Sequence, residues 1–192
     1  MPLAIWLKAG TSATALVLAM AGTATAATTP VGESSTVQAA AVTLRYDDSR
    51  AAGWEAAIAA GVASWNANVS NVRLVEAAPG SAAEIVIVAT TGWPQATLGP
   101  VRPGRQVRVE LGSQAVAQGY NKTRIAAHEL GHSLGLPDTK PGPCSQLMSG
   151  SSAGTACTNA TPNTTERSRV QSAYASGTAA LAPTGQTLID AP

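Results

Sequence analysis

The sequence lacks an apolar run long enough to cross a membrane. Its most apolar stretch, around TALVLAM, is shorter than the ~20 residues that a spanning helix needs, and no stop-transfer pattern follows it. The stretch lies between Lys8 and a small-residue A-x-A sequence at residues 24–26, an arrangement typical of a secretory signal peptide. We therefore expect residues 1–26 to be a signal peptide and the protein to be secreted without a membrane partner. A buried N-terminal helix is the alternative.

Charge is also scarce, and neither sign is in excess. The chain has 12 Lys and Arg residues against 11 Asp and Glu, and loss of Lys8 with the signal peptide makes the two counts equal. No basic stripe is present, which argues against a nucleic-acid partner. The cations that do cluster are Arg102, Arg105 and Arg108, and the Pro and Gly residues around them predict a solvated hairpin tip.

Cysteine is limited to Cys144 and Cys157. An even pair in an exported chain favours a disulfide. A pair of metal thiolates is the alternative, but neither a second cysteine pair nor a nearby histidine is present to complete such a site. Residues 27–41 contain no cysteine, so a pro-segment there would be unable to block a metal through a thiolate.

Composition divides the chain into four segments. After the signal peptide, residues 27–41 are rich in Thr, Ser and Ala and predict a linker or short pro-segment, and residues 177–192 predict a flexible C-terminal tail. Residues 42–176 are long enough for one domain with its own core. Strands are predicted at 42–46, 72–75, 84–90 and 107–111, and helices from Gly53, at 122–134 and from Asn163. This order indicates an α+β domain.

Both histidines of the chain lie in AAHELGHSLGLPD, residues 126–138. His128 and His132 are four residues apart, so a helix places both on one face, where their imidazoles can point at one ion. Glu129 is next to His128, where a general base takes a proton from water at a metal. Two histidines placed at random would be four apart in roughly one chain in a hundred. A core helix with two incidental histidines is therefore the weaker interpretation.

A catalytic zinc needs a third protein ligand and an open fourth position. Gly135 ends the predicted helix and can adopt the left-handed conformation that turns the chain back. Asp138 then follows, six residues after His132, and its carboxylate is placed to close the site. The sequence thus predicts a zinc site formed by His128, His132 and Asp138, with Glu129 as the catalytic base.

HELGHSLGLPD resembles the H-E-x-x-H-x-x-G-x-x-D pattern of the snapalysin family, small secreted bacterial zinc endopeptidases related to the metzincins. The resemblance continues through GPCSQLMSG (142–150), CTN (157–159) and ERSRV (166–170), and it is weak in the N-terminal half. It implies a small metzincin-like domain with a twisted mixed sheet, an active-site helix, a Met-turn and a C-terminal helix. The implied activity is hydrolysis of peptide bonds in extracellular proteins through a metal-activated water. We expect a monomer that acts on protein or peptide substrates.

The resemblance also assigns roles to residues after the motif. Met148 matches the methionine of the Met-turn, which packs beneath the zinc-binding histidines, and this agrees with the use of methionine as a gap-filling core residue. Cys144 and Cys157 match the family's disulfide. Lys140 stands where relatives carry a tyrosine that is thought to stabilise the oxyanion. Its ammonium is expected either to stabilise the same charge or to point to solvent.

Some features leave other functions open. Relatives hold calcium with an acidic residue and a threonine, where this chain has Asn121 and Thr123, and asparagine is a poorer ligand for a hard cation. Calcium is therefore disfavoured as a second cofactor. Lys140 is compatible with a non-catalytic secreted zinc-binding protein, a pseudo-protease. An interaction domain without a metal is a further alternative, which the zinc content of the secreted protein distinguishes.

Overall fold

The computed structural model describes residues 40–78, 80–175 and 185–192. The expected signal peptide and nearly all of the segment 27–41 lie outside the described residues. Among the described helices, none has the length and hydropathy needed to span a membrane.

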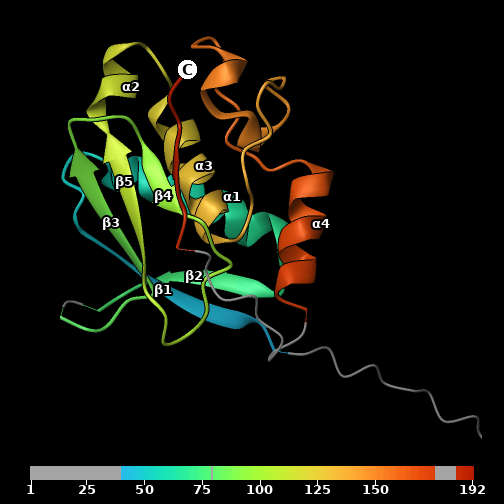
Figure 1. Cartoon of the computed structure of the whole chain (residues 1–192). Coiled ribbons are helices and arrows are strands. Elements are labelled where there is room, and N and C mark those ends of the chain that lie inside the picture. The colour runs from blue at the N-terminus through green and yellow to red at the C-terminus, as the bar shows by residue number, and fades with distance from the viewer. Residues whose placement is uncertain (1–39, 79, 176–184) are drawn as a thin grey trace, which may run out of the picture. The chain divides into compact units, whose positions relative to one another are not determined.

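One mixed sheet is present in the described part of the chain, with the strand order β2-β1-β3-β5-β4-β6. β1 pairs in parallel with β2 and β3, and β3 pairs in parallel with β5. β4 runs antiparallel to both β5 and β6 (Figure 1). The bounds are β1 Val42–Arg50, β2 Val72–Glu76, β3 Ile85–Thr90, β4 Gln95–Thr97, β5 Val107–Gly112 and β6 Thr187–Ile189. The four predicted strands are thus confirmed, whereas β4 and β6 were not predicted.

The helices include the three that the sequence predicted. Their bounds are α1 Glu55–Asn68, α2 Ser113–Ala117, α3 Lys122–Ser133, the 3-10 helix η1 Leu147–Ala153 and α4 Thr164–Ala173. α1 packs closely on α3, where Trp65 is fully buried and its indole N–H donates to the Ala127 carbonyl at 2.8 Å. Asn163 and Glu166 form a capping box at the start of α4. Together, these elements form the expected α+β domain.

The C-terminal segment differs from the expected flexible tail. Residues 187–189 form β6, which adds to the sheet beside β4, and Asp190 is only 5% exposed. The pairing uses backbone groups, so it needs no apolar pattern in the side chains. The prediction of a tail was therefore wrong for residues 185–192, and residues 176–184 lie outside the described part.

Arg102 also differs from its expected place at a solvated tip. Its guanidinium lies 4.4 Å from the centroid of the Tyr174 ring and donates to the Ala173 carbonyl. The Tyr174 hydroxyl in turn donates to the Val101 carbonyl at 2.8 Å. Arg102 therefore joins its loop to the end of α4, while Arg105 is exposed as predicted.

Gly99 connects the end of β4 to the end of α3. Its N–H donates to the His132 carbonyl at 2.8 Å. A Cβ at this position would lie 2.0 Å from the Ser133 carbonyl oxygen. We expect Gly99→Ala to push this loop off α3 and to lower the free energy of unfolding by about 1–3 kcal/mol, measured by urea titration. Gly92→Ala is the matched control, because a Cβ there meets nothing within 4 Å; equal stability of the two variants would contradict the expectation.

Candidate metal centre

α3 carries both histidines into the interior. The helix begins after Asn121, whose side-chain oxygen accepts a hydrogen bond from the Arg124 N–H at 2.9 Å. His128 and His132 lie one turn apart and are fully buried. The helix ends before Gly135, which has the predicted left-handed conformation with a φ of 99°. The chain then turns back toward the histidines.

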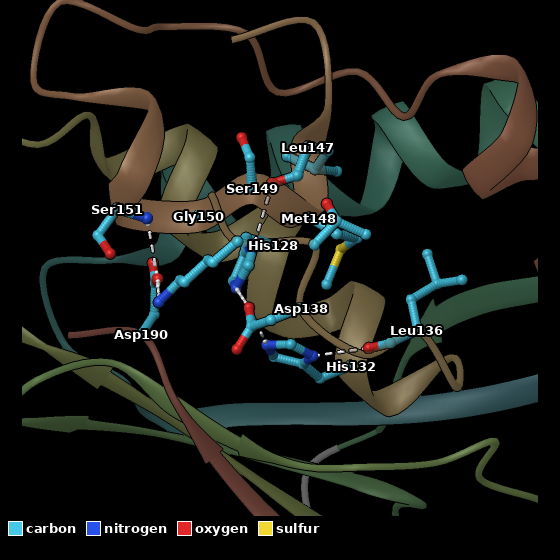
Figure 2. A network of polar contacts seen from close by, with 12 residues as sticks. His128, His132, Leu136, Asp138, Leu147, Met148, Ser149, Gly150, Ser151 and Asp190 are labelled. Carbon is cyan, nitrogen blue, oxygen red and sulfur yellow. Dashed lines mark hydrogen bonds and ion pairs between the residues drawn. The ribbon is translucent and has the colours of Figure 1, made fainter. Parts of the chain in front are cut away.

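Asp138 meets the two histidines after this turn. Its Oδ1 atom lies 3.3 Å from His128 Nε2 and 3.5 Å from His132 Nε2 (Figure 2). These three atoms are buried, and no hydrogen-bond partner satisfies them within the described part of the chain. The three residues that the sequence proposed as ligands are therefore brought together.

The other ring nitrogens are held by backbone carbonyls. His128 Nδ1 lies 3.0 Å from the Leu147 carbonyl oxygen, and His132 Nδ1 lies 2.7 Å from that of Leu136. A carbonyl only accepts, so each Nδ1 carries the proton and donates it. In the neutral form, each imidazole thus has its lone pair on Nε2, facing Asp138, which is the orientation of metal-ligating histidines.

This donor set fits zinc. Two imidazole nitrogens and one carboxylate oxygen match a catalytic zinc site with an open fourth position. Ligand bonds of about 2.0–2.1 Å in a tetrahedral arrangement place ligand atoms about 3.3–3.4 Å apart. The distances of 3.3 and 3.5 Å from Asp138 to His128 and His132 agree with that spacing. An ion would also satisfy three buried polar atoms that have no hydrogen-bond partner among the described residues.

The pKa values of the two histidines move in opposite directions. Burial disfavours the charged form of His128, but the neighbouring Asp138 and Glu129 carboxylates outweigh it and raise the pKa of His128 to about 9. Burial and the charge of His128 lower the pKa of His132 to about 4. The surrounding carboxylates thus stabilise one positive charge between the two histidines, and they would stabilise a bound cation in the same way.

Glu129 lies beside this cluster on α3. It is fully buried, and both of its carboxylate oxygens are without a hydrogen-bond partner among the residues described. Burial raises the pKa of Glu129 well above the ordinary value of a glutamate. One of its oxygens lies within 4.8 Å of a ring nitrogen of His128 and of a carboxylate oxygen of Asp190. Glu129 is therefore close to the centre, and its carboxylate is free of hydrogen bonds to the described residues.

The metal centre lies in a segment that matches a known protein family. A sequence profile of the Streptomyces extracellular neutral proteinase (M7) family matches residues 41–177. The chain belongs to this family. The resemblance inferred from the HELGHSLGLPD motif is thereby confirmed.

Curated relatives agree with this assignment. The extracellular small neutral protease of Streptomyces coelicolor is 44% identical over 75% of this chain and 65% of its own length. That of Streptomyces caespitosus is 39% identical over 71% of this chain and 99% of its own length. The chain thus spans less than two thirds of the length of the first curated relatives that it matches. Among solved structures, archaemetzincin from Methanopyrus kandleri is 14% identical with a TM-score of 0.46, covering 71% of this chain and 97% of that one.

Met148, which the family resemblance placed in the Met-turn, lies beside His128 (Figure 2) and against α3. It is 1% exposed and packs against Gly131, where a Cβ would lie 2.6 Å from the methionine sulfur. Its carbonyl accepts from the Thr139 N–H at 2.8 Å, which joins this turn to the segment that carries Asp138. The glycine between the two histidines therefore permits the close approach of the methionine.

Two buried charged residues that hold this turn were missed in the sequence. Glu166 accepts from the Met148 N–H at 2.8 Å, and Arg124 donates to the carbonyls of Asn159 at 2.7 Å and Gln146 at 3.0 Å. For Glu166, the one signal in the sequence is its position three residues after Asn163, which is the spacing of a capping box. Nothing in the local pattern indicated Arg124, because its partners are distant backbone carbonyls.

The predicted disulfide is confirmed. Cys144 and Cys157 are bonded, with their Cα atoms 5.5 Å apart. The bridge closes a loop that contains Met148 and η1. In the chain-entropy model, a loop of this length contributes roughly 3 kcal/mol to stability.

Lys140 has a partner that the sequence did not suggest. Its Nζ atom lies 2.5 Å from Asp190 Oδ1 and donates to the Ala191 carbonyl at 3.0 Å. It is therefore neither directed only to solvent nor free beside the metal centre. The C-terminal segment engages it.

Proposed function

We propose that this protein is a secreted zinc-dependent metalloendopeptidase that hydrolyses peptide bonds in extracellular proteins. The observation that carries the proposal is the convergence of His128 Nε2, His132 Nε2 and Asp138 Oδ1 at 3.3–3.5 Å, beside the buried and unpaired Glu129. Membership in a proteinase family supports catalysis over the alternative of a zinc-binding pseudo-protease. The proposal rests on the donor set and the carboxylate together.

In this proposal, His128, His132 and Asp138 hold one Zn²⁺. When bound, the ion polarises water and the carbonyl of the peptide bond. Glu129 accepts a proton from the attacking water and donates it to the nitrogen of the leaving amine, so the proton balance closes within one turnover. The carbonyls of Leu136 and Leu147 keep the imidazoles in the orientation and tautomer that the ligands need.

The remaining parts of the proposal concern export and other ligands. Four curated relatives carry the description extracellular small neutral protease, which supports secretion of this chain. We further propose that residues 1–26 are removed on export and that the secreted protein is a monomer. N-terminal sequencing of the secreted protein tests the cleavage. We leave calcium out of the proposal, because the Asn121 oxygen caps α3.

Removal of the metal tests the proposal. We expect the purified chain to contain about one zinc ion, to lose hydrolysis of casein in a chelator and to regain it on addition of Zn²⁺, since the ion supplies the Lewis acid. Elemental analysis and release of acid-soluble peptides are the measurements. Casein cleavage that persists in chelator after complete loss of zinc would contradict the proposal, and bound zinc without any proteolysis would favour the pseudo-protease.

A further inference from the structure

The last described residues form a strand that the family does not account for. The family match ends at residue 177, whereas β6 begins at Thr187. Gln95 pairs with Ile189, Ala96 with Leu188, and Thr97 with Thr187. Further hydrogen bonds flank this pairing on both sides, from the Leu98 N–H to the Gln186 carbonyl and from the Asp190 N–H to the Pro94 carbonyl. Figure 1 shows this segment in red beside β4.

Without β6, β4 would be the edge of the sheet. An edge strand presents unpaired N–H and C=O groups, and an extended peptide binds such an edge through main-chain hydrogen bonds. β4 is also joined to the helix of the metal centre, because Gly99, two residues after it, donates to the His132 carbonyl at 2.8 Å. A peptide added to β4 therefore runs beside the helix of the metal ligands, and β6 takes that path in the antiparallel direction.

The segment continues from β6 into the metal centre. The Asp190 carboxylate accepts from the Ser151 N–H at 2.9 Å (Figure 2) and forms the 2.5 Å ion pair with Lys140. The Ala191 carbonyl accepts from Lys140 Nζ at 3.0 Å and from the Ser151 hydroxyl at 2.8 Å. One Asp190 oxygen lies within 4.8 Å of the His128 and Glu129 ligand atoms. The segment is thus fixed at the sheet and at the turn above the centre.

Little room remains beside this segment. A cavity of about 10 Å³ is left among residues that include Tyr120, His128, Gly150 and Asp190. A cavity of that size is at the lower limit for one water molecule. A substrate therefore has no space in this part of the centre while Asp190 is in place.

We propose that residues 186–192 are an intramolecular, substrate-like occupant of the peptide-binding edge of β4, and that the full chain is latent until this segment leaves. The inference rests on the proposed function. Asp190 anchors the segment by its charge, and Lys140 is the ion-pair partner of Asp190 on the domain. Because the segment is tethered, its effective concentration is in the millimolar range. With an intrinsic dissociation constant of about 0.1 mM for binding of the segment to the edge of β4, blocked molecules then outnumber open ones by about ten to one.

Variants of the full chain test the proposal. Asp190→Lys places a second cation beside Lys140, so that repulsion takes the place of their ion pair. We expect this variant to raise kcat/KM on casein about tenfold. A chain that ends at residue 177 should be activated to a similar degree. The shortened chain retains all of residues 41–177, which match the family. The Streptomyces caespitosus relative aligns with this chain over 99% of its own length, so it has little beyond the matching segment. Glu76→Gln is the control, since it removes an exposed carboxylate from β2 at the opposite edge of the sheet.

A peptide added in trans provides a readout besides activation. The synthetic peptide GQTLIDAP, residues 185–192, should inhibit the chain that ends at residue 177 competitively and should have no effect on the full chain. Its fluorescein-labelled form should bind the shortened Glu129→Ala variant in an anisotropy titration, and this readout does not need catalysis.

The outcomes separate this inference from the proposed function. Equal kcat/KM for the full chain, Asp190→Lys and the shortened chain, together with no binding of the peptide, would overturn the inference and leave the protease assignment intact. Absence of cleavage in all zinc-loaded forms would overturn the protease assignment, and peptide binding would then decide whether the edge of β4 accepts this segment. If the shortened chain does not fold, Asp190→Lys in the full chain decides the question.

Discussion

Glu129→Ala is expected to lower kcat/KM on casein by a factor on the order of 10²–10⁴ and to leave about one zinc ion bound. The carboxylate is fully buried, both of its oxygens are free of hydrogen bonds within the described residues, and it stands next to His128 on α3. These properties suit a group that exchanges a proton with water in each turnover. The proposed zinc ligands are three other residues, so the metal should remain.

The measurement is casein hydrolysis with elemental analysis of the same sample, on the full chain and on the chain that ends at residue 177. Glu129→Gln is a second variant that keeps the shape of the side chain and removes its basicity, and it should be equally inactive. Glu76→Ala removes an exposed glutamate on β2 and should leave turnover unchanged. Turnover by Glu129→Ala within about threefold of the unsubstituted protein would be too small a loss for a general base and would remove Glu129 from the mechanism.

Asp138→Ala is expected to abolish both zinc binding and proteolysis. Asp138 supplies the single oxygen that meets both Nε2 atoms, at 3.3 Å from His128 and 3.5 Å from His132. Loss of a ligand should weaken zinc binding by more than the roughly 10–100-fold that loss of an outer contact costs. Competition with a chromophoric chelator measures the change in zinc affinity.

The control for this experiment is Asp48→Ala, which removes a carboxylate from β1 without touching the centre. It should bind zinc as the unsubstituted protein does. If Asp138→Ala also binds zinc with unchanged affinity, the third ligand is a different group, and Asp190 is then the first residue to substitute, because it lies within 4.8 Å of His128.

The parts of the fold that the sequence predicted depend on local patterns. Four buried residues have helical spacing, namely Trp54 at the N-cap of α1 and Ile58, Val62 and Trp65 within it. The approach of the two histidines needs only the geometry of one helix turn, and the return of the chain at Gly135 needs only the backbone freedom of glycine. These signals are contained within about ten residues of sequence.

The parts that it did not predict depend on distant backbone groups. β4 and β6 have three residues each, too few to show a period, and their pairing uses N–H and C=O groups that every sequence has. Arg102 differs from its predicted place at a solvated tip, and no role was predicted for Arg124. Their guanidinium groups donate to backbone carbonyls, those of Ala173 and Asn159. Such partners are identified only once the chain is folded.

Glu166 has a consequence for how the domain opens. Its Oε2 atom accepts from the Asn163 N–H at 2.6 Å as part of the α4 cap, and its Oε1 atom accepts from the Met148 N–H at 2.8 Å. One carboxylate therefore closes the first turn of α4 and anchors the methionine beneath the histidines. Fraying of that turn releases the methionine amide at the same time, so the two segments form one cooperative unit of local unfolding. The rigidity of the metal centre thus depends partly on a helix that contributes no ligand to it.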